Sequence, residues 1–153
     1  MANTYSKICT QIVFAVKGRN NSISETWEDE LYKYINGVVR GTSNKFYCIG
    51  GMPDHLHLLV SYRPPVRLSD LIRDLKANSS GFVNRKNYLR SVFRWQRGYG
   101  AFSYWQSQIP GLIRYIKNQK EHHKRRSFRE EYIAMLNKFV IDYDDKYLFD
   151  FYD

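Results

Sequence analysis

The sequence predicts one α+β domain, residues 1–153, in which helices pack on an antiparallel sheet. The chain has 153 residues, of which 43% are hydrophobic, enough for one core and too few for two. Segments with the two-residue period of strands alternate with segments of helical period. No stretch holds the roughly 18 apolar residues of a membrane span, so we expect a cytoplasmic location and no membrane partner.

The first half of the chain predicts a strand, a helix and two more strands. Residues 6–16 are apolar and β-rich and end at a Gly-Arg-Asn-Asn turn. Apolar residues three and four apart predict a helix within 24–41. Residues 45–50 and 55–62 have strand composition, and Gly51-Met52-Pro53-Asp54 between them favours a hairpin connection.

The second half predicts a long helix, a fourth strand and two further helices. The helices are expected at residues 68–83, at about 110–124 and at about 128–139, and the strand within 92–104. The resulting order, β-α-β-β-α-β, is that of a ferredoxin-like antiparallel sheet with additional C-terminal helices.

The positive charge is concentrated in the middle of the chain. Residues 63–129 hold 16 of the 24 Lys and Arg residues and only 3 of the 15 acidic ones. Aromatic residues alternate with these cations, as in Arg94-Trp95-Gln96-Arg97-Gly98-Tyr99. This mixture suits a groove that neutralises phosphates while bases stack on rings, although a solvated basic face has the same composition.

Two histidines interrupt a strand that otherwise looks buried. His55 and His57 share one face of the strand, about 7 Å apart along it, and the apolar residues at 56, 58 and 60 share the other. Only the apolar face is expected to be core. Two imidazoles with open positions beside them suit a metal ion that takes a substrate oxygen, and the alternative is a pair of solvated histidines.

A second polar group lies on the helix predicted at 110–124. Tyr115 and Gln119 are one helical turn apart, so a phenol hydroxyl and an amide oxygen can face the same point. The alternative for Tyr115 is an amphipathic residue at the rim of a helix interface. Cys9 and Cys48 lie in apolar strand-like segments and are expected to be reduced core residues.

These pieces, in this order, resemble the IS200/IS605-type single-tyrosine (Y1) HUH transposases. The resemblance covers nearly the whole chain, from Ile12-Val13-Phe14 through residues 98–103 to Tyr115-Ile116-Lys117-Asn118-Gln119 and the following His122-His123. The histidine pair alone is a weak motif. The combination of the pair with the later tyrosine and glutamine is specific.

The resemblance implies a single-stranded DNA transposase that cleaves and rejoins DNA through a 5′-phosphotyrosine intermediate. Tyr115 would be the nucleophile, and His55, His57 and Gln119 would hold a divalent metal ion, Mg²⁺ or Mn²⁺. Asp54 could orient an imidazole. His122 and His123 are additional candidate ligands.

The resemblance also implies a homodimer that recognises hairpins at the ends of a DNA element, with the tyrosine helix serving its own subunit or its partner. The predicted phosphate-contacting residues are Arg67, Arg73, Lys76, Arg85, Lys86, Arg90, Arg94 and Arg97. Three alternatives stay open: a host-retained relative that processes repeated palindromes, a single-stranded nucleic-acid-binding module without catalysis, and a structural or regulatory metal-binding protein.

Overall fold

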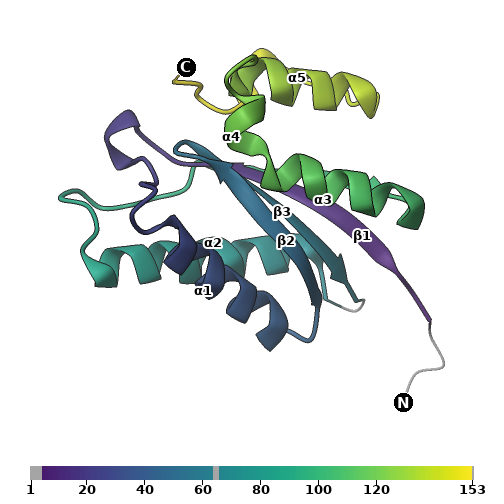
Figure 1. Cartoon of the computed structure of the whole chain (residues 1–153), viewed down its shortest axis with the longest axis horizontal. Coiled ribbons are helices and arrows are strands. Elements are labelled where there is room, and N and C mark those ends of the chain that lie inside the picture. Colours follow the sequence, from purple (N-terminus) through teal and green to yellow (C-terminus); the bar gives the residue numbers. More distant parts are fainter. Residues whose placement is uncertain (1–4, 64–65, 153) are drawn as a thin grey trace.

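A four-stranded antiparallel sheet forms the centre of the molecule (Figure 1). The computed structural model describes residues 5–63 and 66–152. The strands are β1 (Ile8–Ala15), β2 (Lys45–Met52), β3 (His55–Tyr62) and β4 (Gly100–Tyr104). They lie in the order β2-β3-β1-β4, and every neighbouring pair is antiparallel. The predicted α+β class and ferredoxin-like sheet are confirmed.

Helices cover both faces of this sheet (Figure 1). On one face lie α1 (Glu28–Gly41) and α2 (Leu68–Lys86). On the other lie α3 (Ile109–Lys117), α4 (Gln119–His122) and α5 (Phe128–Lys138). Among the described residues, no helix has the length and apolar character needed to span a bilayer.

The face under α1 and α2 holds the larger core. Three acidic residues in the first turn of α1 favour a helix start there, because the amino end of a helix carries partial positive charge. The helix then buries Leu31, Ile35 and Val39 at helical spacing. They pack in one cluster with the apolar side chains of β3, namely Leu56, Leu58 and Val60.

The opposite face of the sheet is also buried, which the sequence analysis did not predict. Ile109, Leu112 and Ile116 of α3 pack against Cys9, Cys48 and Leu59. Both cysteines are free thiols in this core, as predicted, and burial raises the pKa of Cys48 to about 11. A second cluster joins β1 to α5. The expectation that only one face of the histidine strand is core is therefore wrong.

Two predicted elements differ from the structure. The single helix expected at about 110–124 is interrupted at Asn118, whose φ of −100° and ψ of 23° end α3 before α4 begins. The fourth strand is confined to residues 100–104 and is preceded by one isolated bridge between Val16 and Trp95. The interruption turns the chain after Tyr115, so that α4 and α5 can close over the histidine strand.

Candidate active site

The two histidines of β3 lie side by side beneath the helices of the second face. Their ring centroids are 5.1 Å apart, and both side chains are fully buried. Antiparallel pairing with the central strand places His57 opposite Val13 and His55 opposite Ala15. The predicted common face is confirmed, and the alternative of two solvated histidines is excluded.

Each of these imidazoles is oriented by an oxygen at its Nδ1 atom. His55 Nδ1 lies 2.7 Å from Asp54 Oδ1, in agreement with the orienting role considered for Asp54. His57 Nδ1 lies 2.7 Å from Gln11 Oε1, and the Gln11 amide donates in turn to the Tyr104 hydroxyl at 3.0 Å. Because both oxygens accept, each Nδ1 carries the proton, and the Nε2 atoms of the neutral rings have only lone pairs.

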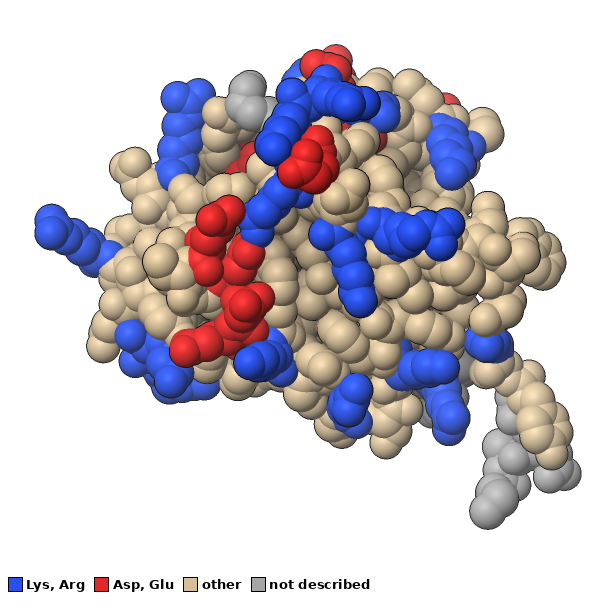
Figure 2. Space-filling model, in the orientation of Figure 1, with Lys and Arg blue, Asp and Glu red and all other residues tan. Residues whose placement is uncertain are grey.

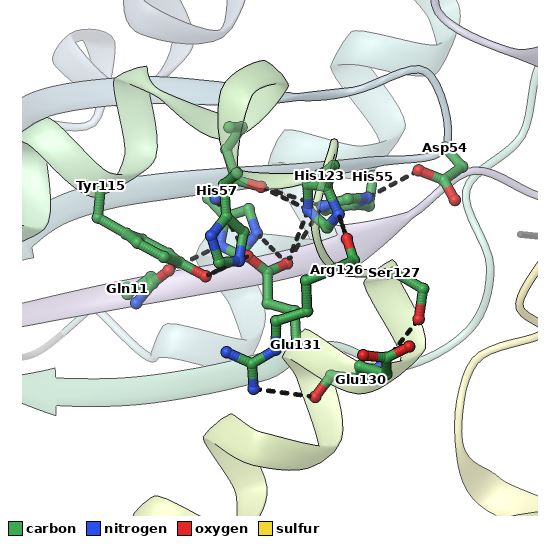
Figure 3. A network of polar contacts seen from close by, with 12 residues as sticks. Gln11, Asp54, His55, His57, Tyr115, His123, Arg126, Ser127, Glu130 and Glu131 are labelled. Carbon is green, nitrogen blue, oxygen red and sulfur yellow. Dashed lines mark hydrogen bonds and ion pairs between the residues drawn. The ribbon is translucent and has the colours of Figure 1, made fainter.

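The carboxylate of Glu131, from α5, lies where these Nε2 atoms point (Figure 3). Its Oε1 is 3.0 Å from His57 Nε2 and 3.4 Å from His55 Nε2. The ligand atoms of the three side chains all lie within 4.8 Å of one another. Lone pairs that face carboxylate oxygens repel them unless a proton or a metal ion lies between.

Tyr115 approaches the same carboxylate from α3. Its hydroxyl donates a hydrogen bond to Glu131 Oε2, and its ring lies 6.0 Å from the ring of His57. Gln119 donates from Nε2 to the same Oε2 at 3.1 Å and turns its Oε1 to within 3.3 Å of His55 Nε2. One chain thus brings together all four predicted site residues, with the tyrosine helix beside its own histidines.

The electrostatics follow from burial and from Glu131. Burial and the nearby Glu131 charge raise the pKa of Tyr115 well above its ordinary value, so the phenol keeps its proton near neutral pH. Burial lowers the pKa of His57, although the negative charge of Glu131 acts to raise it. Burial also opposes the charged form of His55, but its bonds to Asp54 and Glu131 outweigh this and raise its pKa. Contacts with the histidines hold the pKa of Glu131 low although burial acts in the opposite direction.

The donor set fits a divalent metal ion. It contains imidazole nitrogens, a carboxylate and an amide oxygen, all of them known metal ligands. In the neutral rings the Nδ1 protons leave the Nε2 lone pairs directed inward, where an ion would take the place of the proton that otherwise lies between His55 and Glu131. Water has little access, because His55, His57, Gln119 and Glu131 are at most 1% exposed.

The predicted phosphate-contacting residues on α2 lie apart from this centre, whereas the segment of Arg94 and Arg97 runs beside the end of β1, where the backbone N–H of Gln96 donates to the Ala15 carbonyl at 2.8 Å. Those on α2 belong to the helix that covers the opposite face of the sheet (Figure 1). Arg73 pairs with Asp70 at 3.2 Å and with Asp74 at 3.3 Å, and Lys76 donates to the Gln96 carbonyl at 2.9 Å. Figure 2 shows Lys and Arg side chains spread over the face it presents, with acidic groups gathered over α1. The eight predicted DNA contacts stay predictions.

Three residues at the site were not predicted from the sequence: Glu131, Gln11 and Arg126. A signal for Glu131 exists in the sequence. Phe128, Glu131, Tyr132 and Met135 are all buried and follow the i, i+3, i+4, i+7 spacing of one helix face, so the carboxylate stands on an apolar stripe. Gln11 similarly interrupts a strand that is otherwise almost wholly apolar. A buried polar residue in such a position needs a partner, and that requirement is the signal.

Comparison with known proteins identifies the family. The family model described as "Transposase IS200 like" matches residues 4–119, most of the chain and all four predicted site residues. The chain belongs to the IS200-like transposase family. The predicted resemblance to single-tyrosine transposases is confirmed. The match ends before His122, His123 and Glu131.

Solved structures support the fold of this IS200-like family member. The crystal structure of a protein from Deinococcus radiodurans R1 that is described as a transposase aligns with a TM-score of 0.63 and 19% sequence identity. The alignment covers 78% of this chain and 95% of that protein. A REP-associated tyrosine transposase bound to a REP hairpin has a TM-score of 0.55 at 16% identity, covering 76% of this chain and 68% of its own. A search of curated proteins finds no match.

Proposed function

We propose that this IS200-like family member cleaves and rejoins single-stranded DNA through a covalent 5′-phosphotyrosine at Tyr115. One observation carries the proposal: the Tyr115 hydroxyl is bonded to the carboxylate that also faces His55 and His57. The nucleophile and the candidate metal ligands therefore share Glu131. A buried aromatic residue with only a packing role does not require this arrangement.

The proposed reaction is a transesterification. The Tyr115 oxygen forms a bond to the phosphorus, the bond from phosphorus to the 3′ oxygen breaks, and the phosphate stays on the 5′ end of the downstream strand. Tyr115 loses its proton, and Glu131 Oε2 is the acceptor already in contact with it. The departing 3′ oxygen takes up the proton that Glu131 accepted, directly or by exchange through water, and becomes a hydroxyl. A different 3′ hydroxyl can reverse the reaction, so joining needs no external energy.

His55, His57 and Gln119 are the predicted ligands of a divalent ion, predicted as Mg²⁺ or Mn²⁺, and Glu131 joins them on the grounds of its position. Such an ion supplies positive charge that stabilises the phosphate in the transition state. The protein's own contribution is orientation. Asp54 and Gln11 each fix one imidazole by its Nδ1 proton, so that the Nε2 lone pairs stay directed at the centre.

DNA can reach Tyr115 through two open cavities. One, of about 360 Å³, is lined by Tyr115, Arg126 and Lys138 among others. The other, of about 750 Å³, is lined by Tyr115, Arg114, Arg126 and further basic residues. Arg126 lines both cavities, and its guanidinium donates to the backbone carbonyl oxygen of Glu130 at 3.4 Å. Cations that flank a reacting phosphate position it and neutralise its charge.

More distant contacts with DNA remain as predicted from the sequence. Cations on α2 and in the loop that follows would hold DNA beyond the cleavage site, such as a hairpin, and a homodimer remains the predicted assembly. The similarity to a REP-associated transposase bound to a hairpin keeps a host-retained relative as a second candidate, with the same chemistry on repeated palindromes.

Covalent capture tests the proposal. The protein is incubated with Mn²⁺ and labelled single strands drawn from the DNA beside its own gene, and the products are separated on a denaturing gel. A labelled protein band is expected for wild type and for Tyr147→Phe, an exposed control tyrosine, and is expected to be absent from Tyr115→Phe. An undiminished band in Tyr115→Phe contradicts the proposal. Binding of the same strands on native gels without any adduct favours the binding-module alternative.

A further inference from the structure

A third imidazole points at the same centre. His123 follows α4 and has a side chain only 5% exposed. Its Nδ1 lies 2.7 Å from the backbone carbonyl oxygen of Arg126. A carbonyl oxygen can only accept, so Nδ1 carries the proton and the Nε2 of the neutral ring has a lone pair. That Nε2 lies 3.0 Å from Gln119 Oε1 and 3.2 Å from Glu131 Oε1.

His123 therefore repeats the arrangement of His55 and His57. In each of the three rings an oxygen fixes the Nδ1 side, and the Nε2 side faces Glu131 Oε1. The acceptors differ in kind: a carboxylate for His55, a side-chain amide for His57 and a backbone carbonyl for His123. All three neutral rings carry the proton on Nδ1 and direct the Nε2 lone pair at Glu131 Oε1. The centre between them is therefore rich in electrons, and a cation would stabilise it.

The neighbouring His122 lies differently. Its Nε2 is 3.4 Å from the Tyr115 hydroxyl and 3.5 Å from the other carboxylate oxygen, Glu131 Oε2, and its side chain is 23% exposed. It stands on the nucleophile's side of Glu131. His122 is thus a matched control for His123.

The spacing of the donor atoms supports a shared ion. Metal–nitrogen bonds of about 2.0–2.1 Å put neighbouring ligand atoms about 3.0 Å apart at right angles and about 3.4 Å apart at tetrahedral angles. The contacts of Glu131 Oε1 with the three Nε2 atoms measure 3.0, 3.2 and 3.4 Å. Gln119 Oε1 lies 3.3 Å from His55 Nε2 and 3.0 Å from His123 Nε2. All five distances fall in this range. The ligand atoms that already lie within 4.8 Å of one another are those of His55, His57 and Glu131, so His123 completes the set by a small shift toward them when an ion binds.

We propose that His123 is a third imidazole ligand of the metal centre, beside His55, His57 and Glu131, and that the centre therefore selects a transition-metal ion such as Mn²⁺, Co²⁺ or Zn²⁺ over Mg²⁺. Imidazole suits these ions, whereas Mg²⁺ prefers oxygen ligands and keeps several waters. The inference deepens the metal role in the proposed function. It does not depend on DNA cleavage, and His123 and Glu131 lie outside the residues that the family model matches.

Metal titration without DNA tests the inference. Isothermal calorimetry with Co²⁺, Mn²⁺ and Mg²⁺ is run on wild type, His123→Ala and His122→Ala, with circular dichroism to check the fold. We expect Co²⁺ to bind wild type at least about 100-fold more tightly than Mg²⁺. His123→Ala should weaken Co²⁺ binding by at least about tenfold, and His122→Ala by less than about twofold. Equal losses in the two variants, or no preference over Mg²⁺, overturn the inference.

A second measurement uses the wild-type chain and needs no variant to fold. Pulsed electron paramagnetic resonance of the Mn²⁺-loaded protein counts coordinated imidazoles by their nitrogen couplings. Three imidazoles support the inference, and two overturn it. If three are found and no DNA adduct forms in the capture assay, the cleavage proposal fails while the metal centre stands; if two are found and the adduct forms, the reverse holds.

Discussion

Gly50 determines how closely the tyrosine helix can approach the sheet. A Cβ atom added to Gly50 of β2 would lie 2.1 Å from the carbonyl oxygen of Ile116 and 2.9 Å from its carbonyl carbon. Ordinary contacts of a Cβ atom begin at 3.4 Å, and backbone atoms cannot rotate away as a side chain can. Gly50→Ala must therefore move α3 outward by about 1 Å, because packed interiors have no free space to absorb the methyl group. Tyr115 is the residue next to Ile116 and moves with it.

We expect Gly50→Ala to slow adduct formation by about 10²-fold, since a misplacement of about 1 Å in a reacting group costs that much. Overpacking should also lower the free energy of unfolding by about 1–3 kcal/mol. The loss of rate should exceed what partial unfolding explains, because a domain with about 5–15 kcal/mol of stability stays almost wholly folded after losing about 1–3 kcal/mol.

The assay is the single-turnover rate of adduct formation, measured beside the thermal unfolding midpoint. Gly37→Ala is the matched control, because no heavy atom lies within 4 Å of its added Cβ and alanine favours the helix that contains it. The control should keep the wild-type rate and an equal or higher midpoint. A wild-type rate of adduct formation by Gly50→Ala would show that close packing of α3 on β2 does not position Tyr115 for cleavage. That result would refute the prediction.

Three further predictions concern the site. Glu131→Gln should lose most of its metal affinity and most adduct formation, whereas Glu130→Gln, which changes the exposed neighbour, should keep both. Calorimetry measures the metal affinity, and the denaturing gel measures the adduct. An active Glu131→Gln variant would exclude the carboxylate from the reaction. Because the histidines hold the pKa of Glu131 below its ordinary value of 4.5, its contribution to stability is complete above about pH 4.5 and is lost as the pH falls below it. Unfolding measured between about pH 5 and pH 3 should therefore show a larger loss for wild type than for Glu131→Gln, and parallel curves would contradict this assignment. Arg126→Ala should reduce adduct formation. Arg40→Ala, which removes an exposed cation of α1 on the opposite face of the sheet, should change it little, and equal effects on the rate would refute the position given to Arg126 beside the phosphate.

The fold could be predicted because its periodicities are local. The strand at 55–62 and the helices at 68–86 and 128–138 each carry an apolar pattern that needs no knowledge of distant residues. The break at Asn118 could not be predicted, since it has no glycine or proline to mark it and follows from how the segment after Tyr115 packs.

The site could be predicted in part. The histidine pair, Tyr115 and Gln119 form a recognisable sequence pattern, and the structure brings them together. Glu131 was missed because one acidic residue in the first turn of a helix usually reports a favourable helix start, and burial by distant elements decides otherwise. His123 was left as one of two candidates, because adjacent histidines differ only in the direction that the folded backbone gives them.

The identity of the covalent linkage tests the central claim most directly. Arg114 precedes Tyr115 and Lys117 follows two residues later, so trypsin releases the tripeptide Tyr115-Ile116-Lys117. After the adduct is trimmed with nuclease and digested, mass spectrometry should find this tripeptide carrying a nucleotide through its 5′ phosphate. A nucleotide on any other peptide, or one joined through a 3′ phosphate, would contradict the account.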